Sequence, residues 1–256
     1  MFNSLFTSSF AENFSELLIT LLAVLIALTL HEFAHGYTAY KLGDNTARYM
    51  GRLSLNPMRH LDPLGTICMI FFHFGWAKPV PIDPRYFRKP KRDFAITALM
   101  GPLTNIVVGF ITGFFYVLFY SIFYKYGVSS DIPFVYNSLY YLFEFFGVFF
   151  SVNIGLGIFN LIPIPPFDGS RLLNVILPER LYFKVMRYER QIYLALVGWL
   201  LLGPWVYRAI VSLPFVASNP VLSSIAKIFS LSGLISEATG FIINRIIDLW
   251  LLLPIF

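Results

Sequence analysis

Long apolar runs are the feature of this 256-residue sequence that most limits what it can fold into. A helix that crosses a bilayer needs about 20 mostly apolar residues. Within lipid, only helices and closed barrels satisfy all of their backbone hydrogen bonds. Charged residues make up 13% of the chain, against about 25% in soluble domains. The sequence therefore predicts an all-α polytopic membrane protein.

Four runs are long enough to span a membrane: Leu17–Leu42, Phe94–Tyr124, Leu139–Ile164 and Ile192–Val216. The tail, Val221–Phe256, is apolar but interrupted by charged residues, so we expect either another span or a helix in the membrane interface. A shorter apolar run, Leu64–Phe74, fits a re-entrant or buried segment. Together these runs predict a bundle of about 4–6 transmembrane helices.

Basic residues set the expected orientation. Ten of the 19 Lys and Arg residues lie between Lys41 and Arg92, and five lie between Arg171 and Arg190. Loops rich in Lys and Arg stay in the cytoplasm, so we expect a multi-pass protein of the cell membrane with an external N-terminus. The net charge of +5 follows from this bias, and we expect no nucleic-acid partner.

The basic region after the first span differs from the apolar runs. Its segments Thr46–Pro57 and Trp76–Phe87 combine turn residues with short strand-like pieces. We expect a small β-structure there, at the cytoplasmic membrane surface.

The first span ends in the motif HEFAH, from His31 to His35. Positions i and i+4 share one face of a helix, so the two imidazoles can bind one metal ion with Glu32 beside them. The alternative is a pair of histidines hydrogen-bonded near the lipid headgroups, which leaves the glutamate unexplained. Ionisable groups within a span are costly and usually mark a function, which favours a metal site.

A catalytic zinc ion usually has three protein ligands and one open position. Asp168 follows the third span, on the same expected cytoplasmic side as the two histidines, and is the candidate third ligand. An ordinary Asp-Gly turn is the alternative. Nearby prolines interrupt the apolar stretch, and irregular backbone at membrane depth is tolerated where it lines a water-filled cavity. We expect His60 to be a loop histidine near the surface rather than a ligand.

Three motifs occur in order along the chain: HEFAH (His31–His35), GPLTN (Gly101–Asn105) and NLIPIPPFDG (Asn160–Gly169). In this combination the chain resembles the site-2 protease family of intramembrane zinc metalloproteases. The block NPMRHLDPLG (Asn56–Gly65) resembles the compact branch, which has no PDZ or CBS domain.

The resemblance implies roles for individual residues. His31, His35 and Asp168 would hold one Zn²⁺ per chain, and Glu32 would be the general base. The implied substrates are single-span transmembrane proteins or peptides in the lipid bilayer, cut in regulated proteolysis or in the clearance of signal-peptide remnants. Residues 1–256 would form a single integral-membrane domain, with a core at about 17–173 and C-terminal helices at 174–256.

Asn105 is a further candidate for the active site, which we expect toward the cytoplasmic side. Its amide can donate to a tetrahedral oxyanion or to the substrate backbone. It can equally form a hydrogen bond between packed helices, and the sequence favours neither role.

Two other functions use the same residues. A membrane metal-binding or transport protein would favour further polar ligands along a path, and often inverted repeats; the sequence shows neither. A catalytically silent homologue acting as an adaptor is the second alternative, and the complete His, Glu and Asp set argues against it.

Overall fold

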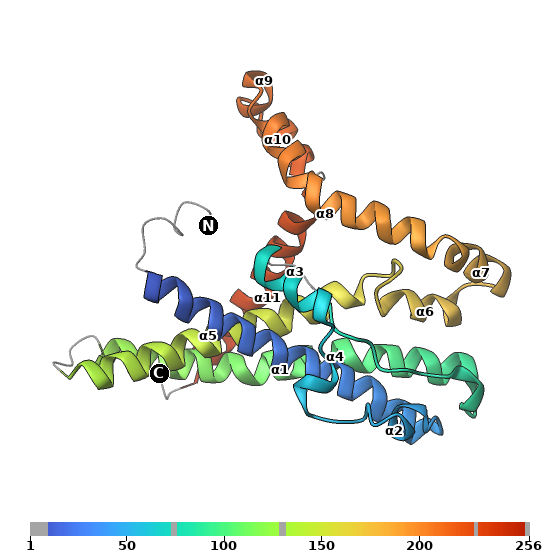
Figure 1. The fold of residues 1–256 in the computed structure, drawn as a ribbon. Helices are drawn as coiled ribbons and strands as arrows, with labels where there is room; N and C mark the ends of the chain where they lie inside the picture. Colours follow the sequence, from blue (N-terminus) through green and yellow to red (C-terminus); the bar gives the residue numbers. More distant parts are fainter. Residues whose placement is uncertain (1–9, 73–75, 128–131, 228–229, 254–256) are drawn as a thin grey trace.

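Three long helices form the centre of the molecule (Figure 1). The structure is a computed structural model, and it describes residues 10–72, 76–127, 132–227 and 230–253. The central helices are α1 (Phe10–Leu42), α4 (Pro90–Ile122) and α5 (Pro133–Leu161), and α4 continues into a π-helical turn, η4 (Phe123–Gly127). Each of the three is long and apolar enough to cross a membrane. They coincide with the first three spans that the sequence predicts.

Small residues let these helices approach closely. A Cβ atom added at Gly109 of α4 would lie 2.6 Å from Ile154 of α5, and one at Gly157 would lie 2.7 Å from Ile106. Ala23 and Ala27 of α1 are fully buried against the same bundle. Between membrane helices, where water drives no hydrophobic association, such close packing is a main source of attraction.

The fourth predicted span is not confirmed as a straight helix. α8 (Glu189–Val211) contains Pro204, and its parts Glu189–Trp199 and Leu202–Val211 are bent by 45°. The described residues therefore contain three candidate spans, or up to four if the bent pair counts as one span. The expected number of 4–6 transmembrane helices is not confirmed.

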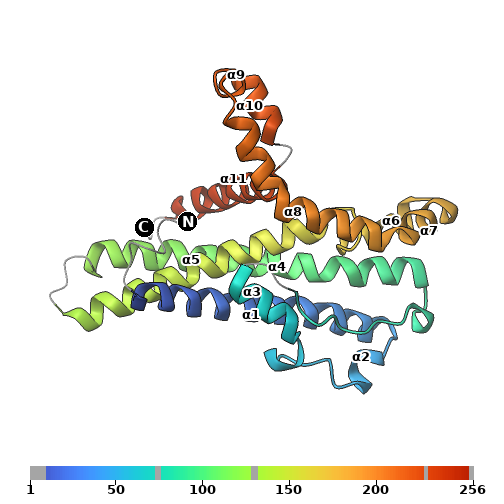
Figure 2. The same ribbon diagram turned by 45° about the horizontal axis from the view of Figure 1, so that its top comes forward.

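The remaining C-terminal helices flank the bundle or extend away from it. They are α6 (Gly169–Ile176), α7 (Glu179–Arg187), α9 (Pro214–Ala217), α10 (Pro220–Ala226) and α11 (Leu231–Leu251). α9 and α10 extend away from the three central helices (Figure 2). α11, the main helix of the apolar tail, packs against α5, α4 and α8.

The predicted small β-structure is not confirmed. The region instead holds α2 (Thr46–Tyr49) and two short 3-10 helices, η2 (Pro57–Arg59) and η3 (Pro84–Tyr86), and no strand occurs among the described residues. An isolated antiparallel bridge joins Leu61 to Ala77. Pro79 and Pro81 have no N–H to give to a ladder. The short apolar run Leu64–Phe74 forms α3 (Pro63–Phe72) as far as it lies within the described residues.

Candidate metal centre

Two histidines one turn apart on α1 meet an aspartate from the start of α6. Nε2 of His31 lies 3.0 Å from Nε2 of His35. Oδ2 of Asp168 lies 3.0 Å from the first of these nitrogens and 3.2 Å from the second. The three atoms thus form a nearly equilateral triangle. It is the one group of three or more potential metal ligands found among the described residues.

The dimensions of this triangle fit a tetrahedral metal site. Ligand atoms held at about 2.0–2.2 Å from a tetrahedral Zn²⁺ ion lie about 3.3–3.5 Å from one another. The observed separations of 3.0–3.2 Å need to widen by only a few tenths of an ångström. Two imidazole nitrogens and one carboxylate oxygen are donors that zinc accepts, and three ligands leave one position open.

Hydrogen bonds on the far side of each ring point both Nε2 atoms at the centre of the triangle. Nδ1 of His31 lies 2.6 Å from Oδ1 of Asn105, and Nδ1 of His35 lies 2.8 Å from the carbonyl oxygen of Thr97. Both partners are oxygen acceptors, so each neutral ring carries its hydrogen on Nδ1 and keeps the Nε2 lone pair for a metal. Ligand histidines are typically oriented in this way.

α4 supplies both acceptors and the space for the rings. Thr97, Gly101 and Asn105 are spaced four residues apart and therefore share one face of the helix. A Cβ atom at Gly101 would lie 2.3 Å from Nε2 of His35 and 2.8 Å from Cε1 of His31. Only glycine leaves room here for both imidazoles. The sequence analysis did not identify Thr97, although its four-residue spacing from the GPLTN motif was a usable signal.

Asn105 lies at the meeting point of the three central helices. Its amide nitrogen donates to the carbonyl oxygen of Ala27 at 3.2 Å and to Oδ1 of Asn153 at 2.9 Å. Asn153 in turn donates to the carbonyl of Phe149, and both asparagines are fully buried. Both amide hydrogens of Asn105 are thus engaged within the bundle, and its oxygen accepts from His31.

The chain places Asp168 through a tight turn after α5. Gly169 packs against the end of that helix: a Cβ atom there would lie 2.3 Å from the carbonyl oxygen of Leu161. The fully buried Ser170 donates its hydroxyl hydrogen to the carbonyl of Phe167 at 2.6 Å. A carboxylate oxygen of Asp168 lies against both Nε2 atoms, and a carboxylate must be ionised when it binds a metal ion.

Exposure differs among the three ligand candidates. The side chains of His31 and His35 are 6% and 7% exposed, whereas the side chain of Asp168 is 25% exposed. The more exposed side of the centre is therefore the Asp168 side.

The other two residues that the sequence analysis discussed lie outside the triangle. Oε2 of Glu32 accepts a hydrogen bond of 2.8 Å from the backbone N–H of Val80. His60 is in a loop, as predicted, but it is only 2% exposed rather than near the surface, and its Nε2 lies 2.7 Å from the carbonyl oxygen of Ser54. It is not part of the metal-ligand group.

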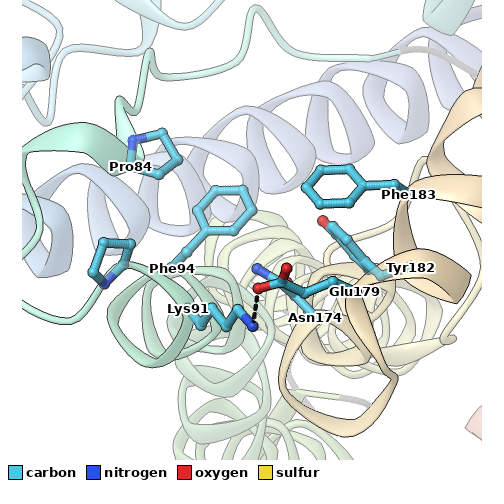
Figure 3. A pocket seen from close by; sticks show the side chains of 8 residues that line it. Pro84, Lys91, Phe94, Asn174, Glu179, Tyr182 and Phe183 are labelled. Carbon is cyan, nitrogen blue, oxygen red and sulfur yellow. Dashed lines mark ion pairs between the residues drawn. The ribbon is translucent and has the colours of Figure 1, made fainter.

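A separate cavity of about 280 Å³ lies between the start of α4 and α7 (Figure 3). Phe94 lines it from α4, and Tyr182 and Phe183 line it from α7. An ion pair between Lys91 and Glu179 joins the two helices beside it. None of the ligand candidates lines this cavity.

Comparisons with known proteins show which family the chain belongs to. The model of "Peptidase family M50" matches residues 19–203. The chain is 38% identical over 161 residues to "Putative zinc metalloprotease YwhC" of Bacillus subtilis, which covers 63% of this chain and 70% of that protein. It is 34% identical over 149 residues to "Putative zinc metalloprotease MJ0611" of Methanocaldococcus jannaschii, covering 56% of this chain and 63% of that protein.

A third relative, "Putative zinc metalloprotease Rip2" of Mycolicibacterium smegmatis, is 32% identical over 90 residues, covering 33% of this chain and 34% of that protein. No solved structure matches the chain significantly. The family match includes HEFAH, GPLTN and the turn that carries Asp168. With its three apolar helices, the chain is a multi-pass membrane protein that belongs to peptidase family M50, the site-2 protease family.

Proposed function

We propose that this protein is a zinc-dependent intramembrane endopeptidase, which hydrolyses peptide bonds within or near the membrane segments of its substrates. The observation that carries the proposal is the triangle of His31, His35 and Asp168, with Glu32 next to it on a helix able to cross a membrane. The relatives, each named as a "Putative zinc metalloprotease", support the choice of metal and reaction.

One zinc ion per chain is the proposed cofactor, because the triangle offers three ligand atoms and is oriented by hydrogen bonds on both rings. Zinc in such a site supplies a Lewis acid that polarises the scissile carbonyl and lowers the pKa of a water molecule toward neutrality. The buried histidines and the close-fitting Gly101 exclude other water from the inner face of the centre.

Glu32 is the proposed general base. Its carboxylate takes the proton from the attacking water and then delivers it to the leaving amine. Asn105 acts in this proposal as a positioning residue for His31. Its two amide hydrogens are donated to Ala27 and Asn153, so the hydrogen-bonding role between helices is favoured over donation to an oxyanion.

The proposed substrates are single-span transmembrane proteins or peptides that reach the site through the bilayer. The proposed orientation has the N-terminus outside and the metal centre toward the cytoplasm. It is supported by the basic residues in the region between α1 and α4 and around α7. Regulated proteolysis and clearance of signal-peptide remnants are the two processes that such substrates suggest.

The arrangement of ligands favours hydrolysis over metal transport, the first of the two rival functions. A transport path needs successive polar ligands at different depths. Among the described residues, the three-residue group is the one candidate metal cluster.

The test is incubation of the purified protein, in lipid nanodiscs, with a panel of single-span substrates. Cleavage that stops with a zinc chelator and returns with added Zn²⁺ is the expected result. A protein that binds zinc but cuts none of the panel would favour the silent adaptor. Zinc flux into protein-containing vesicles, without cleavage, would favour the transporter.

A further inference from the structure

An extended segment, residues 77–83, crosses the second half of α1 and is pinned at several points. We refer to it as the strap. Its Lys78 N–H donates to the carbonyl of His60 at 2.8 Å, and its Asp83 N–H donates to Oδ2 of Asp44 at 2.7 Å. The side chain of Val80 is 6% exposed and lies against Gly36 of α1. The strap is thus fastened to the loop at His60 and to Asp44 just after α1, and it packs on α1 itself at Gly36.

The strap also holds the carboxylate of Glu32. Pro79 and Pro81 have no N–H, so Val80 supplies the one backbone donor in this three-residue stretch. That donor makes the 2.8 Å hydrogen bond to Oε2 of Glu32. The position of the Val80 amide therefore decides how this carboxylate is oriented.

Arg52 binds the carbonyl of the peptide group that contains this amide and the carbonyl of the peptide group before it. Its Nη2 atom donates to the carbonyl of Lys78 at 2.6 Å and to the carbonyl of Pro79 at 3.2 Å. The backbone of Arg52 is itself anchored at the end of α2, where its N–H donates to the carbonyl of Ala47 at 2.8 Å. A continuous series of contacts thus runs from α2 through Arg52 and the strap to Glu32.

The burial of Arg52 is difficult to explain by stability alone. The residue is 9% exposed, its Nε atom has no hydrogen-bond partner, and no ion pair with a carboxylate is found among the described residues. A buried guanidinium compensated only by carbonyl dipoles costs free energy that an apolar side chain would not. Its planar set of donors does, however, bridge two adjacent carbonyls, which an apolar side chain cannot do.

We propose that Arg52 is a positioning residue for the general base: it holds the Lys78 and Pro79 carbonyls so that the Val80 amide keeps the Glu32 carboxylate aligned. The inference rests on the proposed function, in which Glu32 moves the proton. It assigns Arg52 no contact with substrate or metal. Loss of Arg52 should therefore slow the chemical step and leave substrate binding and zinc binding in place.

The principal variant is Arg52→Gln. We expect kcat to fall by about tenfold, as is typical when an outer partner of an active-site group is removed, with KM and zinc content unchanged. Arg52→Lys, which keeps the charge and one donor group, should recover part of kcat. The matched control is Arg59→Gln: Arg59 is in the same region and donates to the carbonyl of Gly51 at 3.4 Å, but it is exposed. Its kcat should equal that of the wild type.

A second variant tests the route through the strap. Val80→Pro removes the N–H that Glu32 accepts and leaves Arg52 intact. If both residues act through the same hydrogen bond, the double variant should lose no more kcat than the more damaged single variant. Hydrogen–deuterium exchange gives a readout that needs no catalysis: Arg52→Gln should raise exchange across the strap in the zinc-bound, substrate-free protein, whereas Arg59→Gln should not.

Three outcomes overturn the inference. Wild-type kcat in Arg52→Gln is the first, and a fall in zinc content that parallels the fall in kcat is the second. The third is a double variant whose losses multiply. If Arg52→Gln does not fold, the kcat of Val80→Pro becomes the test, and a wild-type kcat in that variant rejects the inference. Full activity of Glu32→Gln would instead reject the general base in the proposed function.

Discussion

Two junctions on α4 show how differently this chain treats polar side chains. At the metal centre, α4 faces α1 with His31, His35 and Asn105 buried and hydrogen-bonded. At the cavity beside α7, the same helix uses Lys91 and Glu179, both more than half exposed. A buried polar group must be paired almost completely, while an exposed pair is screened by water. Substitutions at the metal centre should therefore cause large losses of zinc binding or activity, and substitutions at the α7 junction should have small effects.

The largest expected effect is that of His35→Ala. It removes one corner of the triangle, and we expect zinc content to fall from about one ion per chain to near zero, with loss of all proteolysis. Metal analysis of the purified variant by mass spectrometry is the measurement. His60→Gln is the matched control, since His60 is equally buried but lies outside the triangle. Equal zinc content in His35→Ala and wild type would refute the assigned ligands.

Glu32→Gln should separate metal binding from chemistry. The amide keeps the size of the side chain but cannot accept the proton, so we expect activity to fall by about 10²–10⁴-fold. Zinc content should stay at the wild-type level, because Glu32 is not one of the three ligand candidates. Full activity in this variant would show that Glu32 is not the general base. Loss of zinc would show that Glu32 is needed to maintain the metal site.

A third test adds one methyl group at the metal centre and, as a control, one on an open face of α8. At Gly101 an added Cβ atom would lie 2.3 Å from Nε2 of His35, whereas at Gly198 of α8 nothing lies within 4 Å. Gly101→Ala should displace both rings and lower zinc affinity by at least the roughly 10–100-fold that follows when the partners of ligand histidines are lost. Gly198→Ala should leave it unchanged. Competition with a chelator of known affinity measures both, and equal affinities would contradict the close fit at α4.

The sequence predicted the long helices and identified the candidate ligands from local signals. Apolar length alone located α1, α4 and α5. Helical spacing paired His31 with His35, and the distribution of basic residues put Asp168 on the same side of the membrane. The structure brings these three side chains together. These inferences rested on the length and period of a helix and on the cytoplasmic bias of Lys and Arg, and the family resemblance implied the same three ligands.

Contacts between distant backbone groups could not be predicted in this way. The bond from Val80 to Glu32 joins residues 48 positions apart through a main-chain N–H, which has no side-chain pattern. The strand-like composition of the same region predicted β-structure. Its prolines have no N–H for strand pairing, and other backbone groups in it form hydrogen bonds with the side chains of Arg52 and Glu32 instead. In the C-terminal part, hydropathy predicted a span but not the bend in α8.

The smallest expected effect is at the pair of Lys91 and Glu179. The hydrogen bond and the charge of Lys91 lower the pKa of the Glu179 carboxyl below its usual value. A carboxyl with a depressed pKa in the folded protein stabilises the fold above its unfolded pKa of about 4.3, and that stabilisation is lost as pH falls through the folded value. Docking of α7 on α4 should therefore loosen below about pH 4.3, and raised salt should weaken it at neutral pH.

Hydrogen exchange across α7, corrected for the intrinsic chemical rate at each pH, measures this docking. In Glu179→Gln the salt response at neutral pH and the additional acid response should both disappear, because no carboxylate is left to titrate. Zinc content and kcat should match the wild type at neutral pH, since neither residue touches the metal centre. A Glu179→Gln variant that lost zinc would show instead that the two junctions of α4 are coupled, and the contrast between them would no longer hold.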